Sequence, residues 1–425
     1  MRLLLATNHL GLGGSESYLL TVAEQLDRLG HESVIYTPEP EGGVEAASER
    51  AIAVARDEAL DGEYDAALVQ DSGVSHQIAG RRPELTQLFV AHSAKFDLQA
   101  PPQLDGAVGA VVALNDRVAA RMRSFAIEVE IVRLRQPIDM VRFAARGALP
   151  EVPGRALMLS NTPHADRIEM LEAACAEAGL ELVRLGGLSG RTSDVRPALA
   201  GADIVIGYGR SILEAMAMGR AAYVFDWKGG DGWVTADSYA AIEADGFAGS
   251  AGRAAIDLAR LGDDLRRYSA SMGPVNHDLA MAHHKASGHA QELVALFERL
   301  VEPPPRPRVA LDEMARLVRL EWRAQLEING LVHENAHLRD LLTQNEEKIA
   351  EARRTVADEV GRTYEASASW RLTRPLRALG ALGAGLRRSL RRAGRLGSPR
   401  ADAPCSDATT SAAGSPPPSP GADRE

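Results

Sequence analysis

The chain has 425 residues, 45% of them hydrophobic, and a formal net charge of −10 at pH 7. One hydrophobic core tends to divide beyond roughly 250–300 residues, so the length predicts two domains, and the negative charge argues against a nucleic-acid-binding protein. The two cysteines, Cys175 and Cys405, are too far apart to predict a disulfide framework or a zinc site.

The first residues predict a strand, a glycine loop and a helix that together form an anion site. Residues 3–6 are apolar, Gly13 and Gly14 belong to a flexible loop, and residues 15–29 have an amphipathic helical pattern. Backbone N–H groups and the helix dipole favour a phosphate at such a helix start. A dinucleotide site is disfavoured, because the third glycine of that fingerprint and an acid after the second strand, residues 33–36, are absent.

No stretch of the sequence predicts a signal peptide or a membrane span. The apolar run of residues 3–6 is interrupted by Asn8 and His9, too early for a secretory signal. No uninterrupted apolar segment approaches the ~20 residues that cross a bilayer. We therefore expect a cytoplasmic protein.

Apolar runs alternate with helical segments in residues 1–300, which is typical of parallel α/β sheets. Pro137 stops the last strand of the first predicted domain, so we divide the chain into residues 1–140 and 141–300. Two such domains face each other across a cleft, where ligand sites are common. The further expected strands are residues 66–69, 88–91, 110–114, 156–159, 182–185, 204–206 and 222–225.

The segment 202–217 has the most specific pattern. Residues 204–206 predict a strand buried on both faces, and Gly207 and Gly209 allow a sharp turn after it. The next helix places Glu214 near the carboxyl end of the strand, where open α/β sheets bind ligands. A carboxylate there accepts hydrogen bonds from a ribose diol. On composition alone, a solvated helical glutamate is the alternative.

This segment resembles the nucleotide-binding stretch of retaining glycosyltransferases of the GT-B fold, family 4. That family has an acid, a glycine-aromatic-glycine turn, and a second acid eight positions after the first. Gly207-Tyr208-Gly209 and Leu213-Glu214-Ala215-Met216-Ala217 match this pattern. The resemblance implies that Glu214 holds the ribose of a nucleotide-sugar donor. Ile206 occupies the position of the first acid, which the family associates with the donor sugar or catalysis.

Two further segments resemble the same family. Gly13 and Gly14 match the glycine pair that lies against the donor diphosphate and the acceptor cleft. His92, after the strand at 88–91, is the candidate catalytic residue, because it matches a position where a histidine or small polar group meets the donor sugar. An ordinary loop histidine is the alternative for His92.

The loop after residue 159 departs from the family. Many relatives have an arginine and a lysine there that clamp the diphosphate, whereas this chain has Ser-Asn-Thr-Pro-His at 160–164. Arg210 is the better candidate for a substitute and Arg191 the other, because a guanidinium binds phosphate oxygens in a bidentate manner. A solvent-facing arginine is the alternative.

Residues 229–233 predict a glycine-rich turn at the rim of the cleft. We expect Gly230 and Asp231 to contact the donor there, while Trp233 either stacks on a sugar or base or packs in the core. The four histidines of the last helical segment lack a cysteine or a suitable acid, which predicts solvated side chains rather than a metal site. They are His277, His283, His284 and His289.

The last third of the chain is organised differently. Residues 301–308 are a proline-rich, stiff linker. In residues 309–365, apolar positions recur at alternating spacings of four and three, which predicts a coiled-coil helix and a homodimer. Asn335 and Asn345 lie in this seam and would set its register. A single helix that packs on its own domain is the alternative.

The final residues are strongly basic and then of low complexity. Between residues 371 and 400 there are nine arginines and no acid. We expect residues 366–397 to form an amphipathic segment that binds an anionic membrane surface, with nucleic-acid binding as the competing explanation. Part of this segment, residues 367–376, resembles the ends of enzymes of surface-polysaccharide biosynthesis. Residues 398–425 have the composition of a disordered tail.

These observations predict two Rossmann-like domains followed by a coiled-coil helix. The resemblance implies a metal-independent, retaining transfer of sugar from a nucleotide-sugar donor, without a cofactor, to a glycan or lipid-linked acceptor in cell-surface polysaccharide biosynthesis. Electrostatic stabilisation of the leaving diphosphate would be the main catalytic effect. Because Ile206 replaces an acid and the lysine is missing, a binding or scaffold protein is an alternative. A GT-B sugar-nucleotide epimerase is another, although it needs more acid and base groups than the sequence offers.

Overall fold

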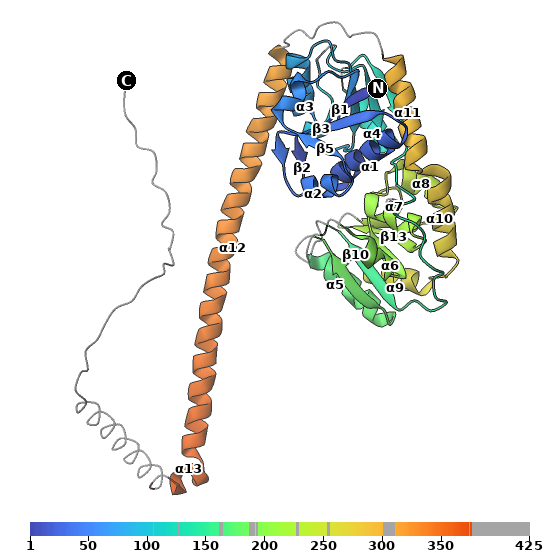
Figure 1. Cartoon of the computed structure of the whole chain (residues 1–425). Helices are drawn as coiled ribbons and strands as arrows, with labels where there is room; N and C mark the ends of the chain where they lie inside the picture. The colour runs from blue at the N-terminus through green and yellow to red at the C-terminus, as the bar shows by residue number, and fades with distance from the viewer. Residues whose placement is uncertain are drawn as a thin grey trace, which may run out of the picture. The chain divides into compact units, whose positions relative to one another are not determined.

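Figure 1 shows the computed structural model of the chain, which describes residues 1–375 except 105, 126, 161–164, 187–191, 193, 227–228, 253–255, 301–310 and 374. The chain divides into two compact units, Met1–Ala324 and Gln325–Glu425. The first unit contains two α/β subdomains, each built on its own mainly parallel sheet. We call each sheet, with the helices that cover it, the first half and the second half of this unit.

The first half has a seven-stranded sheet in the order β5-β3-β1-β6-β7-β8-β9, and every neighbouring pair is parallel. All the strands predicted here are confirmed, β9 is the strand expected before Pro137, and β5 is additional. The strands are β1 (Arg2–Ala6), β3 (Glu32–Tyr36), β5 (Ala53–Ala55), β6 (Ala66–Val69), β7 (Gln87–Ala91), β8 (Ala110–Ala113) and β9 (Glu130–Arg133). The short strands β2 (His9–Leu10) and β4 (Glu39–Pro40) form a separate pair.

Helices cover both faces of this first sheet. Successive side chains of a strand point to opposite faces, so Leu5 of β1 packs with α1 and its neighbour Leu4 packs with α3. This two-sided burial explains the continuous apolar runs in the sequence. The helices are α1 (Gly14–Arg28), α2 (Gly43–Ser48), α3 (Ser72–Arg81), α4 (Asp116–Met122), and the 3₁₀ turns η1 (Asp57–Asp61) and η2 (Asp97–Gln99).

The second half has a five-stranded sheet in the order β11-β10-β12-β13-β14. Its first four strands are parallel, and β14 is antiparallel to β13. The strands are β10 (Arg155–Leu159), β11 (Glu181–Leu185), β12 (Ile204–Gly207), β13 (Ala221–Asp226) and β14 (Gly229–Trp233). The helices are α5 (Ala165–Glu177), α6 (Arg196–Ala200), α7 (Arg210–Ala217), α8 (Tyr239–Ala244), α9 (Leu258–Arg266) and α10 (Met272–His283).

The predicted turn at residues 229–233 is wrong, because these residues form the edge strand β14. A side chain at Gly230 would approach the carbonyl oxygen of Val224 to 2.5 Å, so glycine is required there by close backbone packing. A register shift between Val224 and Phe225 lets the strand bend as it pairs with β13. The glycines therefore serve strand pairing instead of an open loop.

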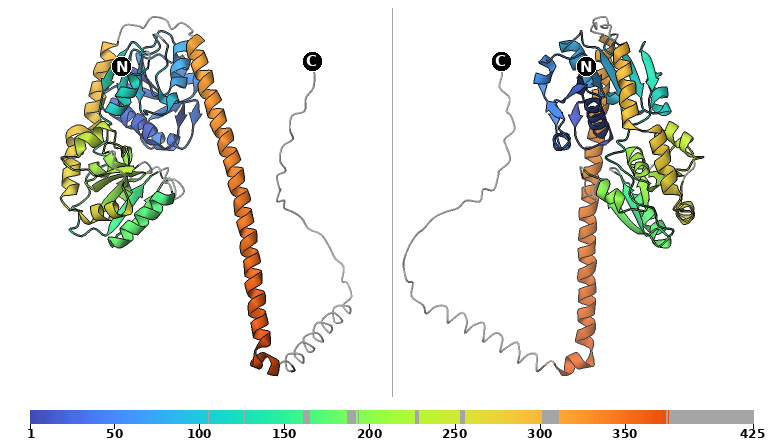
Figure 2. Two further views of the ribbon diagram at one scale, coloured as in Figure 1. Left: turned by 180° about the vertical axis from the view of Figure 1, so that it is seen from behind. Right: turned by 45° about the vertical axis from the view of Figure 1, so that its right-hand side comes forward.

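The chain crosses between the two halves twice, and the crossings lie side by side. Ile138 pairs with Lys285 in a parallel bridge, with the Ile138 N–H donating to His284 O at 2.7 Å. After this point α11 (Ala286–Arg299) packs on the first half, next to α1 (Figure 2). The predicted boundary at residue 300 placed this helix with the second half, whereas its apolar side chains join the core of the first.

The predicted solvated histidines include two that are buried at this crossing. His284 and His289 are 2% and 6% exposed. Their Nδ1 atoms donate to the carbonyls of Gln136 and Arg135, at 2.8 and 2.9 Å, and their Nε2 atoms bond tyrosine hydroxyls. Burial lowers the pKa of His284 to about 3 and that of His289 to about 4, so both stay neutral. Their hydrogen bonds fix residues 135 and 136, at the start of the segment 135–143 that links the two halves and that we call the linker.

In its described residues, the second unit contains the rest of α12 (Leu311–Ala366) and the short α13 (Ala368–Leu372). The predicted helix over 309–365 is thus present, and it exposes a series of apolar side chains. Within the described residues, no helix is long and apolar enough to cross a membrane. The predicted linker at 301–308, the basic segment beyond residue 375 and the tail at 398–425 lie outside the described residues.

Candidate functional site

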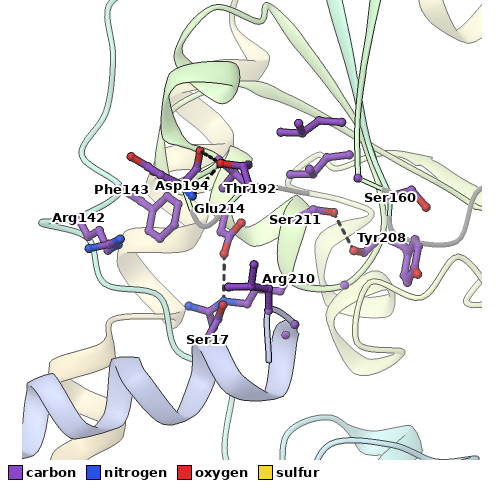
Figure 3. A pocket seen from close by; sticks show the side chains of 18 of the residues that line it. Ser17, Arg142, Phe143, Ser160, Thr192, Asp194, Tyr208, Arg210, Ser211 and Glu214 are labelled. Carbon is purple, nitrogen blue, oxygen red and sulfur yellow. Dashed lines mark hydrogen bonds and ion pairs between the residues drawn. The ribbon is translucent and has the colours of Figure 1, made fainter. Parts of the chain in front are cut away.

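A pocket of about 280 Å³ opens between the two halves of the first unit. One wall is the start of α1, and another is the linker around Arg142 and Phe143. The third wall comes from loops at the carboxyl ends of β10, β11 and β12, which is where parallel α/β sheets bind ligands (Figure 3).

The turn between β12 and α7 depends on two glycines. At Gly207, a Cβ atom would lie 2.7 Å from both the Leu159 carbonyl oxygen and Ser211 Oγ. Gly209 has φ +62°, a conformation that side-chain-bearing residues rarely adopt. The turn lets α7 begin at Arg210, so that Glu214 lies one turn into the helix and lines the pocket.

Glu214 and Arg210 form a buried ion pair at the centre of the site. Arg210 Nε donates to Glu214 Oε1 at 3.0 Å, and the two residues are 9% and 8% exposed, respectively (Figure 3). The same guanidinium donates to the carbonyl of Pro137 at 3.1 Å and to Thr21 Oγ1 of α1 at 3.2 Å. Arg210 therefore ties the second half to the linker and to the first half.

These contacts bury Arg210 between the two halves. The solvent-facing alternative is wrong, because the side chain is buried. All three guanidinium nitrogens already have acceptors, so the geometry fits a residue that orients Glu214 better than a clamp for a diphosphate. Arg191, the other substitute considered, lies outside the described residues.

The electrostatics of the pair follow from its burial. Burial raises the pKa of the Glu214 carboxyl, and the Arg210 guanidinium opposes that shift, with smaller contributions from Arg50 and Arg142. Burial also lowers the pKa of Arg210. Removing one partner of such a pair leaves an uncompensated charge in a low-dielectric environment.

Hydroxyl groups and one further acid also line the pocket. Ser17, Ser160 and Tyr208 face the pocket (Figure 3). Asp194 also lines it, but Arg196 Nε donates to its Oδ1 at 2.7 Å and lowers the pKa of Asp194. Of the two acids in the described lining, Glu214 is the one that pairs with another lining residue, Arg210 of the same helix.

The structure brings together most of the predicted donor-binding residues. Gly13, Gly14, Gly209, Arg210 and Glu214 all line the pocket. Gly207 does not line it but allows the close approach between β10 and β12 that shapes it. The glutamate therefore points into the gap between the halves and not outward to solvent.

Besides Gly207, three further predicted residues do not line the pocket. His92 Nε2 donates to Gln70 Oε1 at 2.8 Å and its ring meets the edge of Tyr18, while burial lowers the pKa of His92 to about 3. Gly230 lies within β14, and Asp231 Oδ1 accepts from the Gly252 N–H at 2.7 Å. A direct contact of these three with a ligand in this pocket is not supported.

Trp233 takes the core-packing alternative. Its Nε1 donates to Asp264 O at 2.8 Å, and its ring packs edge-on against Tyr223. At the position of the family's first acid, Ile206 is fully buried in the same core. No carboxylate is therefore available from that position of β12.

Sequence reasoning missed Arg50, Arg142 and Asp194 as pocket residues. Arg142 follows the linker residue Asp139, whose side chain accepts hydrogen bonds from the backbone of 141 and 142 and from Gln25 and Arg28 of α1. The predicted domain boundary at residue 140, just after Pro137, was a usable signal for Arg142. Arg50 follows the short α2, and no motif marks it.

Comparisons with known proteins resolve the fold. No protein-family model and no curated protein matches the sequence. Anabaena Alr3699/HepE, solved with UDP and glucose, matches with 10% identity and a TM-score of 0.54, over 70% of this chain and 100% of that one. The chain has the GT-B fold.

Two further solved structures agree with this fold. HepE with UDP-glucose matches with 10% identity and a TM-score of 0.50, over 69% of this chain and 99% of that one. The pneumococcal O-GlcNAc transferase GtfA, with UDP and GlcNAc, matches with 9% identity and a TM-score of 0.50, over 71% and 99%. At these identities, the likeness is one of GT-B architecture.

Proposed function

We propose that the chain is a glycosyltransferase that moves a sugar from a nucleotide-sugar donor to a glycan or lipid-linked acceptor in cell-surface polysaccharide biosynthesis. The observation that carries the proposal is the placement of Glu214, which lines the pocket at the carboxyl end of β12, in the same lining as Gly13 and Gly14. The GT-B structures of HepE and GtfA, which hold UDP and a sugar, support it.

In this proposal Glu214 binds the ribose. Arg210 bonds Oε1, and Oε2 has no partner in the part of the chain that the structure describes, so that oxygen can accept from a ribose hydroxyl. The α1 start at Gly13 offers backbone N–H groups to the donor diphosphate, where charge develops as the sugar leaves. We propose that the transfer retains configuration and needs no metal, with arginines supplying the positive charge.

A thermal-shift screen of nucleotide sugars tests the binding step, because a ligand that binds only the folded chain raises its Tm by mass action. We expect one nucleotide-sugar class to raise the Tm, and its nucleoside diphosphate to be released when a suitable acceptor is added. If no nucleotide sugar or nucleoside diphosphate raises the Tm, the proposal is wrong.

A binding or scaffold role is a second candidate, favoured by Ile206, which leaves β12 without the family's first acid. This candidate predicts that a nucleotide sugar raises the Tm but releases no nucleoside diphosphate with any acceptor. The same screen therefore separates the two functions.

We also propose that α12 mediates a homodimer. Its side chains at the predicted seam are half-exposed or more in the second unit, among them Leu331 and Leu342, each 64% exposed. Pairing two such helices would bury this seam. Light scattering should give twice the mass of one chain for the unmodified protein. It should give the mass of one chain for the variant with Leu331, Leu338 and Leu342 changed to lysine. A monomeric full chain would refute the dimer.

For the basic segment 366–397, we propose peripheral binding to the inner face of the membrane. Clustered arginines attract anionic head groups at about 1 kcal/mol each near the surface. The full chain should float with vesicles that contain phosphatidylserine and not with phosphatidylcholine vesicles alone. A variant with glutamine in place of the eight arginines of this segment should stay in solution with both.

A further inference from the structure

The pocket contains more positive charge than its own acids balance. Among the described residues that line it, three are arginines, Arg50, Arg142 and Arg210, and two are acids, Glu214 and Asp194. Glu214 pairs with Arg210, and Asp194 pairs with Arg196, which does not line the pocket. Arg50 and Arg142 therefore remain to be explained.

The guanidinium of Arg50 is held by one ion pair, but not all of its buried nitrogens have a hydrogen-bond acceptor. Its Nη1 donates to Glu24 Oε2 of α1 at 3.2 Å, and its side chain is 8% exposed. Its Nε is buried and has no hydrogen-bond partner in the described structure. A buried guanidinium N–H without an acceptor costs free energy unless a ligand completes it.

The backbone of Arg142 is fixed by a hydrogen bond, whereas its guanidinium has no partner among the described residues. Asp139 Oδ1 accepts from the backbone N–H of Arg142 at 3.1 Å, which fixes the turn after the linker. The guanidinium faces the pocket (Figure 3) and has no hydrogen-bond or ion-pair partner among the residues that the structure describes. Its charge also lowers the pKa of Arg50 and of Arg210, after burial, which is the larger cause for both.

The same lining contains the start of a long helix. Gly13 is the N-cap of the 15-residue helix α1 and provides no side-chain cap, so the first-turn N–H groups are left to another acceptor. Gly13, Gly14 and Ser17 line the pocket together with the two arginines. An anion between them would meet a helix dipole and two guanidinium groups at once.

We propose that Arg50 and Arg142 bind the diphosphate of the donor from the first half and the linker, in place of the basic residues that the loop after β10 lacks. This inference rests on the proposed function and adds the residues that hold the phosphates. Glu214 then grips the nucleoside from the second half, so the two ends of one ligand are held by opposite walls of the pocket.

Calorimetric titration of the full chain with nucleoside diphosphates and with the matching nucleosides tests this division. UDP, GDP and ADP are tried first on the unmodified chain, and the diphosphate that binds is used with its nucleoside. For Arg142→Gln and for Arg50→Gln, we expect the Kd of the diphosphate to rise about 10- to 100-fold, as for loss of a charge-assisted hydrogen bond, and the Kd of the nucleoside to change less than about 2-fold.

Three controls make the outcomes distinct. Arg142→Lys keeps the charge and should recover part of the lost affinity. Arg184→Gln removes an arginine of an exposed pair with Glu172 and should leave both Kd values unchanged. Circular dichroism confirms that Arg50→Gln is folded, and Arg142→Gln decides the result if it is not.

Each remaining result overturns the inference in a recognisable way. If the unmodified chain binds a diphosphate and both glutamine variants bind it equally well, the inference fails and the proposed function stands. If the variants lose nucleoside and diphosphate affinity to the same extent, the arginines act on the fold and not on phosphate. If the unmodified chain binds none of the three diphosphates, the proposed function fails as well.

Discussion

Two glycine-rich, acid-bearing segments of the second half look alike in sequence and differ in the structure. Residues 207–214 and 229–233 each follow a buried strand and each contain an acid. In the first segment Glu214 enters the pocket, with Arg210 as its partner. In the second, Asp231 bonds a backbone N–H of a nearby loop and Trp233 joins the core.

The difference lies in what each segment packs against. The first segment turns at Gly209 into a helix whose start faces the other half, so its polar groups meet across a cleft. The second turns straight back to pair with β13, and its polar groups are used within the second half. Glycines and an acid accompany a change of chain direction in both segments. Only the first segment forms a site, because it faces the other half of the unit.

The largest expected effect is on stability, at the ion pair of the first segment. Arg210→Met leaves Glu214 buried without its partner and removes the bonds to Pro137 and Thr21, which should lower the free energy of unfolding by about 3–5 kcal/mol. Urea denaturation measures this. The matched change Arg184→Met, in an exposed pair, should cost less than about 0.5 kcal/mol. Equal losses would contradict the bridging role of Arg210.

The next effect separates the two acids by ligand binding. Glu214→Gln keeps the shape of the side chain but removes its charge, and we expect nucleoside affinity to fall by about 1.5–3 kcal/mol, that is, about 10- to 150-fold. Asp231→Asn is the matched control, because Asp231 does not line the pocket. Calorimetric Kd values that change equally in both variants would remove the distinction between the segments.

A pH series probes the crossing that holds the halves together. His284 and His289 stay neutral in the folded chain, with pKa values of about 3 and about 4, whereas unfolded histidine binds a proton below pH about 6.5. Their contribution to stability is therefore complete above pH about 6.5 and is lost as the pH falls toward 4.

His289→Asn keeps a donor for the Arg135 carbonyl and removes the titrating ring. Between pH about 6 and about 4.5, the slope of unfolding free energy against pH should decrease by about 1.4 kcal/mol per pH unit. Urea denaturation at several pH values measures the slope, and an unchanged slope would show that His289 also titrates in the folded chain.

The smallest expected effect is at the second segment. Trp233→Phe keeps an aromatic ring but loses the hydrogen bond from Nε1 to Asp264, so it should cost about 1 kcal/mol at every pH. Ligand Kd values should not change. A Kd that rises with this variant would restore the stacking alternative for Trp233.

The sequence was sufficient for the features that depend on local pattern. The strand at 204–206, its glycine turn and Glu214 were predicted because apolar runs, glycines and helical spacing act within a few residues. The pairing of Glu214 with Arg210 was not predicted, although the spacing of four places both on one face of a helix.

Other features depend on contacts between distant parts of the chain. Arg50 and Arg142 meet at the pocket only through the packing of α1 against the linker, and His289 is buried only because α11 returns to the first half. The strand β14 was missed because its turn signals are local, whereas its pairing with β13 and the contact of Gly230 with Val224 are set by the sheet. The periodicity of apolar residues carries no information on contacts between residues that are distant in the sequence.

The paired crossings at Ile138 and Lys285 have a mechanical consequence. Two adjacent, hydrogen-bonded strands of chain resist twisting and sliding, but they permit bending about the line that they share. We therefore expect the two halves to rotate about this line as hinged domains, which would open and close the pocket between them. Small-angle scattering with and without a bound nucleotide would reveal such a swing as a change in the radius of gyration.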